Sequence, residues 1–434
     1  MNETNRRRFC RVLFLLIAIS PCCAVLAAAV WRNSAQSEAL WQSSLRQTLG
    51  VDVEWDRISY PAPGQVRWEG LRFHDVDSGD LVAQVDLCTL TEQGSRLRIA
   101  PVAVTVHAQR AEAIVHALKS SFASAAAAGV EIEPCEISVI GGNKQVVAQW
   151  SLTRAEAWNV ESAGKALIRF QPTGGQEIAL HVEQDQANRT FRLSFDTEKR
   201  ELPLATLNAF FPRSRALGTA STFRGVVQVA QSEDSWDAGI RGTVDQIDLE
   251  TLVNRHTKQQ LTGNGALEIE SAQFRNGKLV AAKGKFGATG GEIGVGFLSD
   301  VSGGFQFRCD YSKQELDERR FETIKYSQLL VQFDLHEGAI ELTGLVEPGQ
   351  IPLLNEDGDP ILVAPAKGTR VSLAYAVQLL FPTAGPRIAA AHESFWLASW
   401  LPLPAAGQLS PWRPKEPAQT APKNLLRQST AGEP

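Results

Sequence analysis

Cysteine is scarce in this 434-residue sequence, and there is no excess of positive charge. Three of the six cysteines lie within the first 23 residues, and the other three, Cys88, Cys135 and Cys309, are far apart and form no CxxC pair. This spacing argues against a disulfide scaffold and against a metal site built from thiolates. The formal net charge of −5 offers no basic surface to a nucleic-acid backbone, so we expect no nucleic acid partner.

The sequence also lacks the motifs of common catalytic and metal sites. Its seven histidines are scattered, and none lies three or four residues from another, so no pair can hold zinc from one helix face. There is no GxSxG nucleophile elbow, and the glycine-rich stretch 263–297 has neither the strand–GxGxxG–helix context nor the lysine of a phosphate-binding loop. We therefore expect no enzyme activity, no catalytic residue, no cofactor and no metal.

Two partial matches coincide in one short acidic segment. The sequence VDSG at residues 76–79 resembles the loop of aspartic proteases, but that chemistry needs two aspartates sharing a proton, and no second Asp-Ser/Thr-Gly occurs. Asp75, Asp77 and Asp86 stand at positions 1, 3 and 12 of a calcium loop, but its sixth position, a glycine in such loops, is Asp80. The pattern favours a plain turn.

Charged residues are absent from residues 12–30, a run of nineteen. As a helix this run would be about 28 Å long, close to the hydrocarbon thickness of a bilayer. Its basic flank lies before it, at Arg6, Arg7, Arg8 and Arg11, which predicts a cytoplasmic N-terminus and an exported body. The alternative is a cleaved signal peptide with its site at residues 27–29, although the apolar run is longer than such signals use. Both interpretations export the body.

The sequence divides into three parts. Residues 1–33 form the basic cytoplasmic start and transmembrane anchor, residues 34–401 form the body, and residues 402–434, with seven prolines, predict a disordered tail. The start carries a net charge of +4 and the tail +2, so the body carries −11. We expect a single-pass protein of the inner membrane with a periplasmic body that does not dock tightly on anionic headgroups.

The body reads as mainly β. From residue 51 to about residue 345 apolar and polar residues alternate, which is typical of strands with one buried face. Turn sequences such as Asn276-Gly277 separate about 18 to 20 such runs. No βαβ rhythm is visible, so we expect a long, mostly antiparallel sheet, curled at the bulges that the glycines of 263–297 predict. The alternation leaves open whether this sheet forms an open groove or a closed sandwich.

Helical spacing is limited to a few segments. Residues 34–49 predict a helix that ends at Gly50 and joins the anchor to the first strand. Residues 109–122 predict a second helix, and residues 202–211 and 248–256 predict two or three helical turns each.

Three N-terminal segments carry a resemblance to a known family. They are LGVDVEW at 49–55, PGQVRWEGLRFHD at 63–75 and GDLVAQVDL at 79–87, and they resemble the N-terminal part of AsmA-like and TamB-like proteins. Residues 263–291 and 329–345 are similar to the C-terminal AsmA-like region. The resemblance implies an envelope protein of double-membraned bacteria, anchored in the inner membrane and linked to outer-membrane biogenesis. It also implies lipid transport along an open, curled β-groove.

By this resemblance, inward-facing apolar residues would line the groove and contact phospholipid acyl chains of the membrane lipid bilayer. The candidates are Phe191, Leu193, Phe195, Phe305, Phe307, Val331 and Phe333. A second hypothesis makes the chain a structural or interaction module, in which these residues form a closed core and the β-sheet binds an envelope protein partner.

Overall fold

The structure is a computed structural model of the chain. It describes residues 30–32, 34–124, 129–142, 144–160, 163–185, 187, 189–208, 210–232, 235–254, 260–345, 351–365 and 369–380. Nearly all of the expected anchor at 12–30 and the whole tail at 402–434 therefore lie outside the described residues. In the part that is described, no helix is both long enough and apolar enough to cross a membrane.

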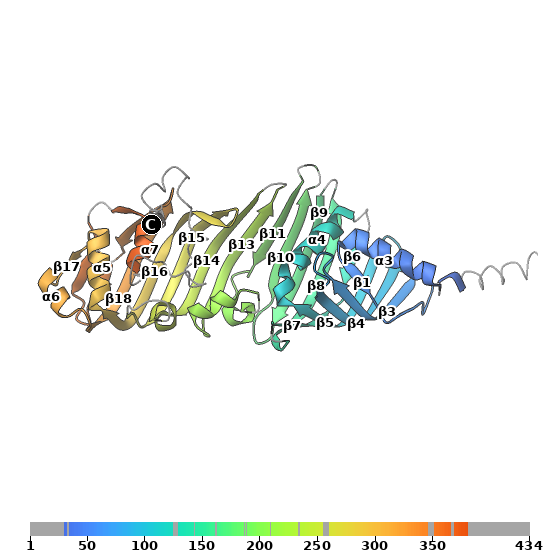
Figure 1. Ribbon diagram of the computed structural model, residues 1–434, viewed down its shortest axis with the longest axis horizontal. Coiled ribbons are helices and arrows are strands. Elements are labelled where there is room, and N and C mark those ends of the chain that lie inside the picture. Colours follow the sequence, from blue (N-terminus) through green and yellow to red (C-terminus); the bar gives the residue numbers. More distant parts are fainter. Residues whose placement is uncertain are drawn as a thin grey trace, which may run out of the picture.

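All described strands belong to one sheet of 22 strands, which confirms the prediction of a large, mainly β body (Figure 1). The first eleven strands are β1 (Asp52–Glu54), β2 (Arg57–Ser59), β3 (Gln65–His74), β4 (Leu81–Gln93), β5 (Arg96–His107), β6 (Gly129–Ile132), β7 (Cys135–Ile140), β8 (Val146–Val160), β9 (Ala163–Pro172), β10 (Ile178–Asp185) and β11 (Thr190–Asp196). The others are β12 (Leu202–Pro203), β13 (Thr222–Gln231), β14 (Trp236–Asp248), β15 (Asn264–Arg275), β16 (Lys278–Gly294), β17 (Arg308–Cys309), β18 (Thr323–His336), β19 (Ala339–Gly344), β20 (Leu353–Leu354), β21 (Pro360–Val363) and β22 (Arg370–Ser372).

The helical elements are short and lie between groups of strands. The α-helices are α3 (Ala35–Leu49), α4 (Ala111–Ser124), α5 (Val295–Phe305), α6 (Lys313–Glu318) and α7 (Leu373–Leu380). Three short 3₁₀-helices are described, η2 (Ala108–Arg110), η3 (Leu204–Leu207) and η4 (Pro212–Leu217), together with one π-helical turn, η5 (Glu250–Asn254). The helices predicted at 34–49 and 109–122 and the helical turns predicted at 202–211 and 248–256 are present as α3, α4, η3 and η5. Helix α5 and the strands beyond residue 345 were not predicted.

The ends of α3 follow directly from its sequence. The Ser34 side chain accepts a hydrogen bond from the Ser37 amide at the N-terminus of the helix. Gly50 ends the helix in the left-handed conformation, with φ of 68°. Because a side chain at this position would both be strained and meet the Ser120 hydroxyl of α4, Gly50 also allows the two helices to approach closely.

Among the described strands, one crossover breaks the antiparallel pattern. Strand β5 pairs in parallel with β6 and β7, and the chain passes from β5 to β6 through α4. A parallel neighbour requires the chain to return to the same end of the sheet, and a helix is the usual connection. This single βαβ unit, which sequence analysis did not expect, places α4 across the sheet (Figure 1).

The sheet is narrower than the number of strands suggests. Several short strands share one position, as β1 and β2 do beside β3, and β6 and β7 do between β5 and β8. The pairings leave about sixteen positions side by side, which at about 4.8 Å each make a sheet roughly 75 Å wide. The expected 18 to 20 strands would have given about 95 Å if each had its own position.

Along β3 and β4 the residues that point toward the core do not alternate regularly. Trp68 and Cys88 are opposite each other and buried, and so are Leu71 and Val85, although the two pairs are an odd number of residues apart. Gly70, between them, has φ of 65°, and a side chain there would overlap the Asp56 carboxylate. The positive φ of Gly70 turns the following side chains of β3 to the other face. The alternation predicted over residues 81–87 is wrong in detail, because Val82, Val85 and Cys88 are the buried residues of this stretch.

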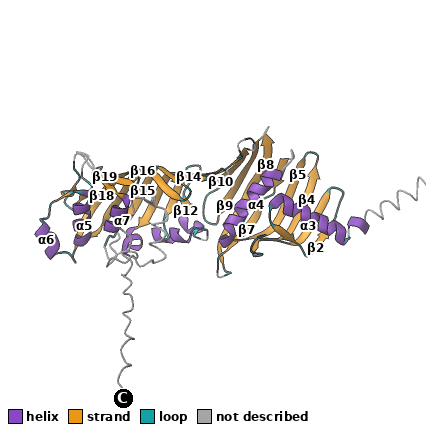
Figure 2. Cartoon of the chain, turned by 45° about the horizontal axis from the view of Figure 1, so that its top comes forward, coloured by secondary structure: helices purple, strands orange, loops and turns teal. Residues whose placement is uncertain are grey.

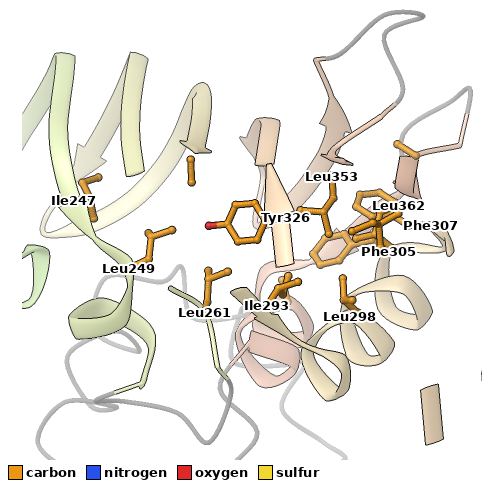
Figure 3. Close-up of a cluster of buried hydrophobic side chains, with 14 of the residues drawn as sticks. Ile247, Leu249, Leu261, Ile293, Leu298, Phe305, Phe307, Tyr326, Leu353 and Leu362 are labelled. Atoms are coloured by element: carbon orange, nitrogen blue, oxygen red, sulfur yellow. The ribbon is translucent and has the colours of Figure 1, made fainter. Parts of the chain in front are cut away.

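Helices and turns pack against one face of the sheet (Figure 2). Helix α3 covers β1 to β5, α4 covers the middle strands, and α5 and α7 lie at the C-terminal end, where the largest cluster of buried residues is found. Figure 3 shows part of that cluster, with Tyr326 among Leu261, Leu353 and Phe305. The Tyr326 hydroxyl donates to the Thr262 carbonyl at 2.6 Å, so its buried oxygen is satisfied.

Candidate functional site

An apolar row runs across the middle of the sheet. Strand pairing places one residue of each strand opposite the next, in the order Ile168, Leu180, Phe195, Val227 and Ile240. A second row beside it contains Ala166, Val182, Leu193 and Val229. Because side chains alternate between faces, both rows project from the same face of the sheet.

The apolar rows lie under the helices. Phe191 is 3% exposed and packs with Val115 and Leu118 of α4. The Phe195 ring lies 6.2 Å from the Phe170 ring, and Phe195 and Leu207 of η3 pack against the same buried cluster. Phe195 contacts the C-terminal cluster as well, so the clusters join into one continuous apolar layer along the sheet.

Five of the seven predicted groove residues lie on this face. Phe191, Leu193 and Phe195 are adjacent on β11. Val331 and Phe333 lie further along on β18, opposite Phe286 and Gly284, and both are half-buried. Since Gly284 has no side chain, the Phe333 ring can lie close over it.

Phe305 and Phe307 do not lie on a strand as predicted. Phe305 is the last residue of α5, and Phe307 follows the left-handed Gln306 that ends this helix. Both are buried, with exposures of 1% and 6%, and their ring centroids are 5.9 Å apart. They belong to the layer that covers the sheet. The prediction was wrong because two alternating phenylalanines indicate a strand. The helical spacing of Val295, Leu298 and Phe305 is a weaker signal, since the glycines between them have low helix propensity.

The opposite face of the sheet is polar. Lys165 faces Glu183 across β9 and β10 at 3.3 Å, and Lys285 faces Glu268 across β15 and β16 at 3.6 Å. These pairs are largely solvent-exposed, so each contributes about 0 to 1 kcal/mol to stability. Their main consequence is that one face of the sheet remains hydrated while the other is apolar.

A shallow hollow of about 510 Å³ lies along β10, β11, β13 and β14, and Leu193 and Val229 of the second apolar row belong to its lining. Its lining includes His181, Glu183, Arg192, Asp237 and Arg275. Glu183 is within ion-pair distance of both Lys165 and Arg192, and Asp237 lies 3.7 Å from Arg275. Because these acids and bases neutralise each other in an open site, the hollow favours no charged ligand.

A second hollow of about 490 Å³ lies where α3 begins, at the N-terminal end of the sheet. We call it the N-terminal hollow; its lining includes Trp31, Arg32, Trp41, Tyr60 and Leu90. The Trp41 ring packs edge-on against Trp68 of β3 at 5.8 Å. Nothing in the sequence pattern predicted this site, and Trp31 follows directly after the apolar run at 12–30. The available signal was the concentration of aromatic residues directly after the apolar run.

The acidic segment after β3 is a turn, as expected. The Asp75 carboxylate accepts hydrogen bonds from the Ser78 hydroxyl at 2.7 Å and from the Asp77 amide. The Ser78 hydrogen bond lowers the pKa of Asp75 below its ordinary value. Asp80 forms an ion pair with Arg110 of η2. Among the described residues, no group of three or more His, Cys, Asp or Glu side chains could hold a metal ion.

The cysteines of the body are free thiols. Cys88 is buried, and Cys135 and Cys309 are half-buried. Burial raises the pKa of Cys88 to about 11 and that of Cys135 to about 11. A thiol must ionise to act as a nucleophile or a metal ligand, so these environments favour the unreactive form.

We expect slow alkylation of these thiols in the native protein. At pH 8 only about one Cys88 side chain in a thousand is ionised when its pKa is about 11, so labelling by iodoacetamide should be at least about tenfold slower than in urea. Because the folded-state pKa of these thiols is raised, their protonated form favours the folded state. This contribution to the free energy of unfolding is fully present below the unfolded-state pKa and is lost as the pH rises through the folded-state pKa. Mass spectrometry of timed samples measures the labelling rates, and urea unfolding at several pH values measures the change in stability. Equal labelling rates with and without urea would contradict the burial of these thiols.

Together, the fold and its two surfaces define an elongated, mainly β protein whose single sheet has one apolar, helix-covered face and one hydrated face. No protein-family model and no curated protein matches the sequence.

Proposed function

We propose that this chain is a non-catalytic envelope protein that handles lipid along the apolar face of its sheet. In this proposal residues 12–30 anchor it in the inner membrane, the body lies in the periplasm, and the ligands are phospholipid acyl chains. The resemblance to AsmA-like and TamB-like proteins in the sequence supports the same assignment, with a role in outer-membrane assembly.

The observation that carries the proposal is the continuity of the apolar layer. Helix α4 packs against both the cluster under α3 and the cluster around Phe191, and Leu180 and Phe195 connect the latter to the cluster around α5. Each methylene transferred from water to such a surface contributes about 0.8 kcal/mol, so an acyl chain can bind without a specific headgroup site.

Helices occupy part of the face that a lipid would use. Phe191 is covered by α4, so a lipid would reach β11 only if α4 moved. Val331 and Phe333 are half-buried on the same face and are the better positions for lipid contact. With a sheet roughly 75 Å wide, one copy would act as a lipid acceptor or as one segment of a longer path.

A photo-crosslinking probe on β18 tests the proposal. We expect full-length protein with p-benzoylphenylalanine in place of Phe333 to form phospholipid adducts in its native membrane. Asp334 is the matched control, because it is the next residue of β18 and is exposed on the polar face. Mass spectrometry of the irradiated protein identifies the adducts.

Lipid adducts at Phe333 and none at Asp334 would support lipid handling. Adducts to a protein at Phe333, with no lipid adduct, would overturn it and favour the alternative, a structural or interaction module with an envelope protein partner. Equal lipid labelling at both positions would also overturn it, because the two faces would then not differ in their contact with lipid.

A further inference from the structure

We propose that the N-terminal hollow binds one acyl chain of a zwitterionic phospholipid, with the headgroup at Arg32 and Glu92. This inference rests on the proposed function and names the place where lipid first contacts the sheet. The N-terminal hollow has a volume of about 490 Å³, which lies within the range of about 300 to 1,000 Å³ found for small-molecule sites.

The inner wall of the hollow is continuous with the apolar face. Trp41, Val66 and Leu90 line the hollow, and all three also pack against the buried cluster beneath α3. That cluster contains Trp68 and Val85, which lie on β3 and β4. An acyl chain in the hollow would therefore contact the beginning of the apolar layer.

The rim of the hollow exposes large apolar side chains. Val30 is 71% exposed, Trp31 52% and Leu40 57%. Trp31 and Leu40 line the hollow, and Val30 is the last residue of the apolar run that begins at residue 12. Exposed apolar groups next to an expected anchor fit contact with a bilayer, and tryptophan is enriched at the headgroup layer.

The polar groups around the hollow match a phospholipid headgroup. The Arg32 guanidinium lies over the Tyr60 ring, 5.3 Å from its centroid, where it could meet a phosphate. The Tyr60 hydroxyl is buried and has no hydrogen-bond partner among the described residues, so it could donate to an ester carbonyl. Glu92 also lines the hollow and would pair with an ammonium group. One base and one acid favour a zwitterionic headgroup over an anionic one.

Lipid crosslinking to the full-length protein tests the site. The protein is reconstituted in vesicles of phosphatidylethanolamine and phosphatidylglycerol, with a trace of phosphatidylethanolamine carrying a diazirine on one acyl chain. We expect adducts on Val66 or Leu90 after irradiation. Leu97→Trp places a large ring in the hollow and should reduce these adducts by about fivefold or more, since little room remains for a chain.

The matched control is Val102→Trp, which adds the same ring to β5 at a position that is 53% exposed and outside the hollow. It should leave the adducts unchanged. Circular dichroism and the thermal midpoint verify that both variants fold. If Leu97→Trp does not fold, Tyr60→Phe replaces it, and it should reduce the adducts by about threefold through loss of one hydrogen bond.

Adducts confined to Trp31 and Leu40 would overturn the inference, because they would show surface contact only. Equal or stronger labelling by a phosphatidylglycerol probe would overturn the zwitterionic assignment. The probe at Phe333 separates this inference from the proposed function. Adducts at Phe333 without adducts in the hollow would leave the function standing and remove this site, whereas absence of both would remove the function as well.

Discussion

Replacement of Phe305 by alanine should destabilise the C-terminal part of the sheet by about 3 to 5 kcal/mol. Phe305 is 1% exposed and joins α5 to the cluster that contains Leu298, Tyr326 and Leu353. Removal of its ring leaves a cavity between the helix and the sheet (Figure 3). Hydrogen exchange of the β16 and β18 amides, followed by mass spectrometry, should therefore accelerate by about 100-fold or more, since 1.4 kcal/mol corresponds to a factor of ten.

Phe321→Ala provides the control for this experiment. Phe321 is 96% exposed, so the same substitution removes a phenyl ring that has little contact with the protein. Its effect should stay within about 0.5 kcal/mol. If the two variants exchanged at equal rates, α5 would not stabilise the sheet, and the assignment of Phe305 to the covering layer would be wrong.

Gly225→Val should separate the two halves of the sheet. Gly225 on β13 faces Gly242 on β14, and a Cβ at Gly225 would overlap the Arg241 carbonyl and lie 2.6 Å from the Gly242 Cα. Thr197 also depends on this position, because its hydroxyl accepts from the Gly225 amide at 2.9 Å. Since the overlap is with backbone, it cannot be relieved by rotation of a side chain. We expect a loss of about 3 kcal/mol or more.

Gly239→Val is the control. Gly239 lies on β14, the strand that pairs with β13, and the nearest atom that a Cβ there would meet is the Ala272 carbonyl oxygen at 3.9 Å. This substitution should change stability by no more than about 0.5 kcal/mol. Limited proteolysis measures the difference, since opening between β13 and β14 would expose this hairpin to cleavage. Equal resistance of both variants would show that β13 and β14 tolerate a side chain between them.

These two substitutions address the two requirements of the proposed function. The pairing of β13 with β14 keeps the apolar rows continuous from the N-terminal half to the C-terminal half of the sheet. Helix α5 and its neighbours shield the C-terminal part of the same face from water. A protein that guides acyl chains needs both a continuous apolar surface and a limited exposure of that surface.

Local patterns were sufficient to predict most of the secondary structure. The period-two alternation of Phe191, Leu193 and Phe195 identified a strand with one buried face, and the structure places them on β11. The helix predicted over residues 34–49 is confirmed as α3, and Gly50 marked its end, because a left-handed glycine satisfies carbonyl groups that the helix leaves unpaired. These features depend on residues that are close together in the sequence.

The prediction failed where contacts between distant residues decided the structure. Phe305 and Phe307 alternate like strand residues, but burial against Tyr326 and Leu353 favours a helix in this stretch. The residues of the N-terminal hollow come from the start of α3, from the segment around Tyr60 and from β4 and β5. Because these segments are far apart in the sequence, no single motif predicts the hollow.

The sequence by itself determined that the body is mainly β, that most strands between residues 51 and 345 have one apolar face, and where α3 begins and ends. Only the tertiary structure decided that about sixteen strand positions form one sheet, that helices cover its apolar face, and that Trp41, Tyr60 and Leu90 surround one hollow. The physical reason is that alternation fixes which side chains share a face, whereas pairing and coverage depend on which distant segments bury that face from water.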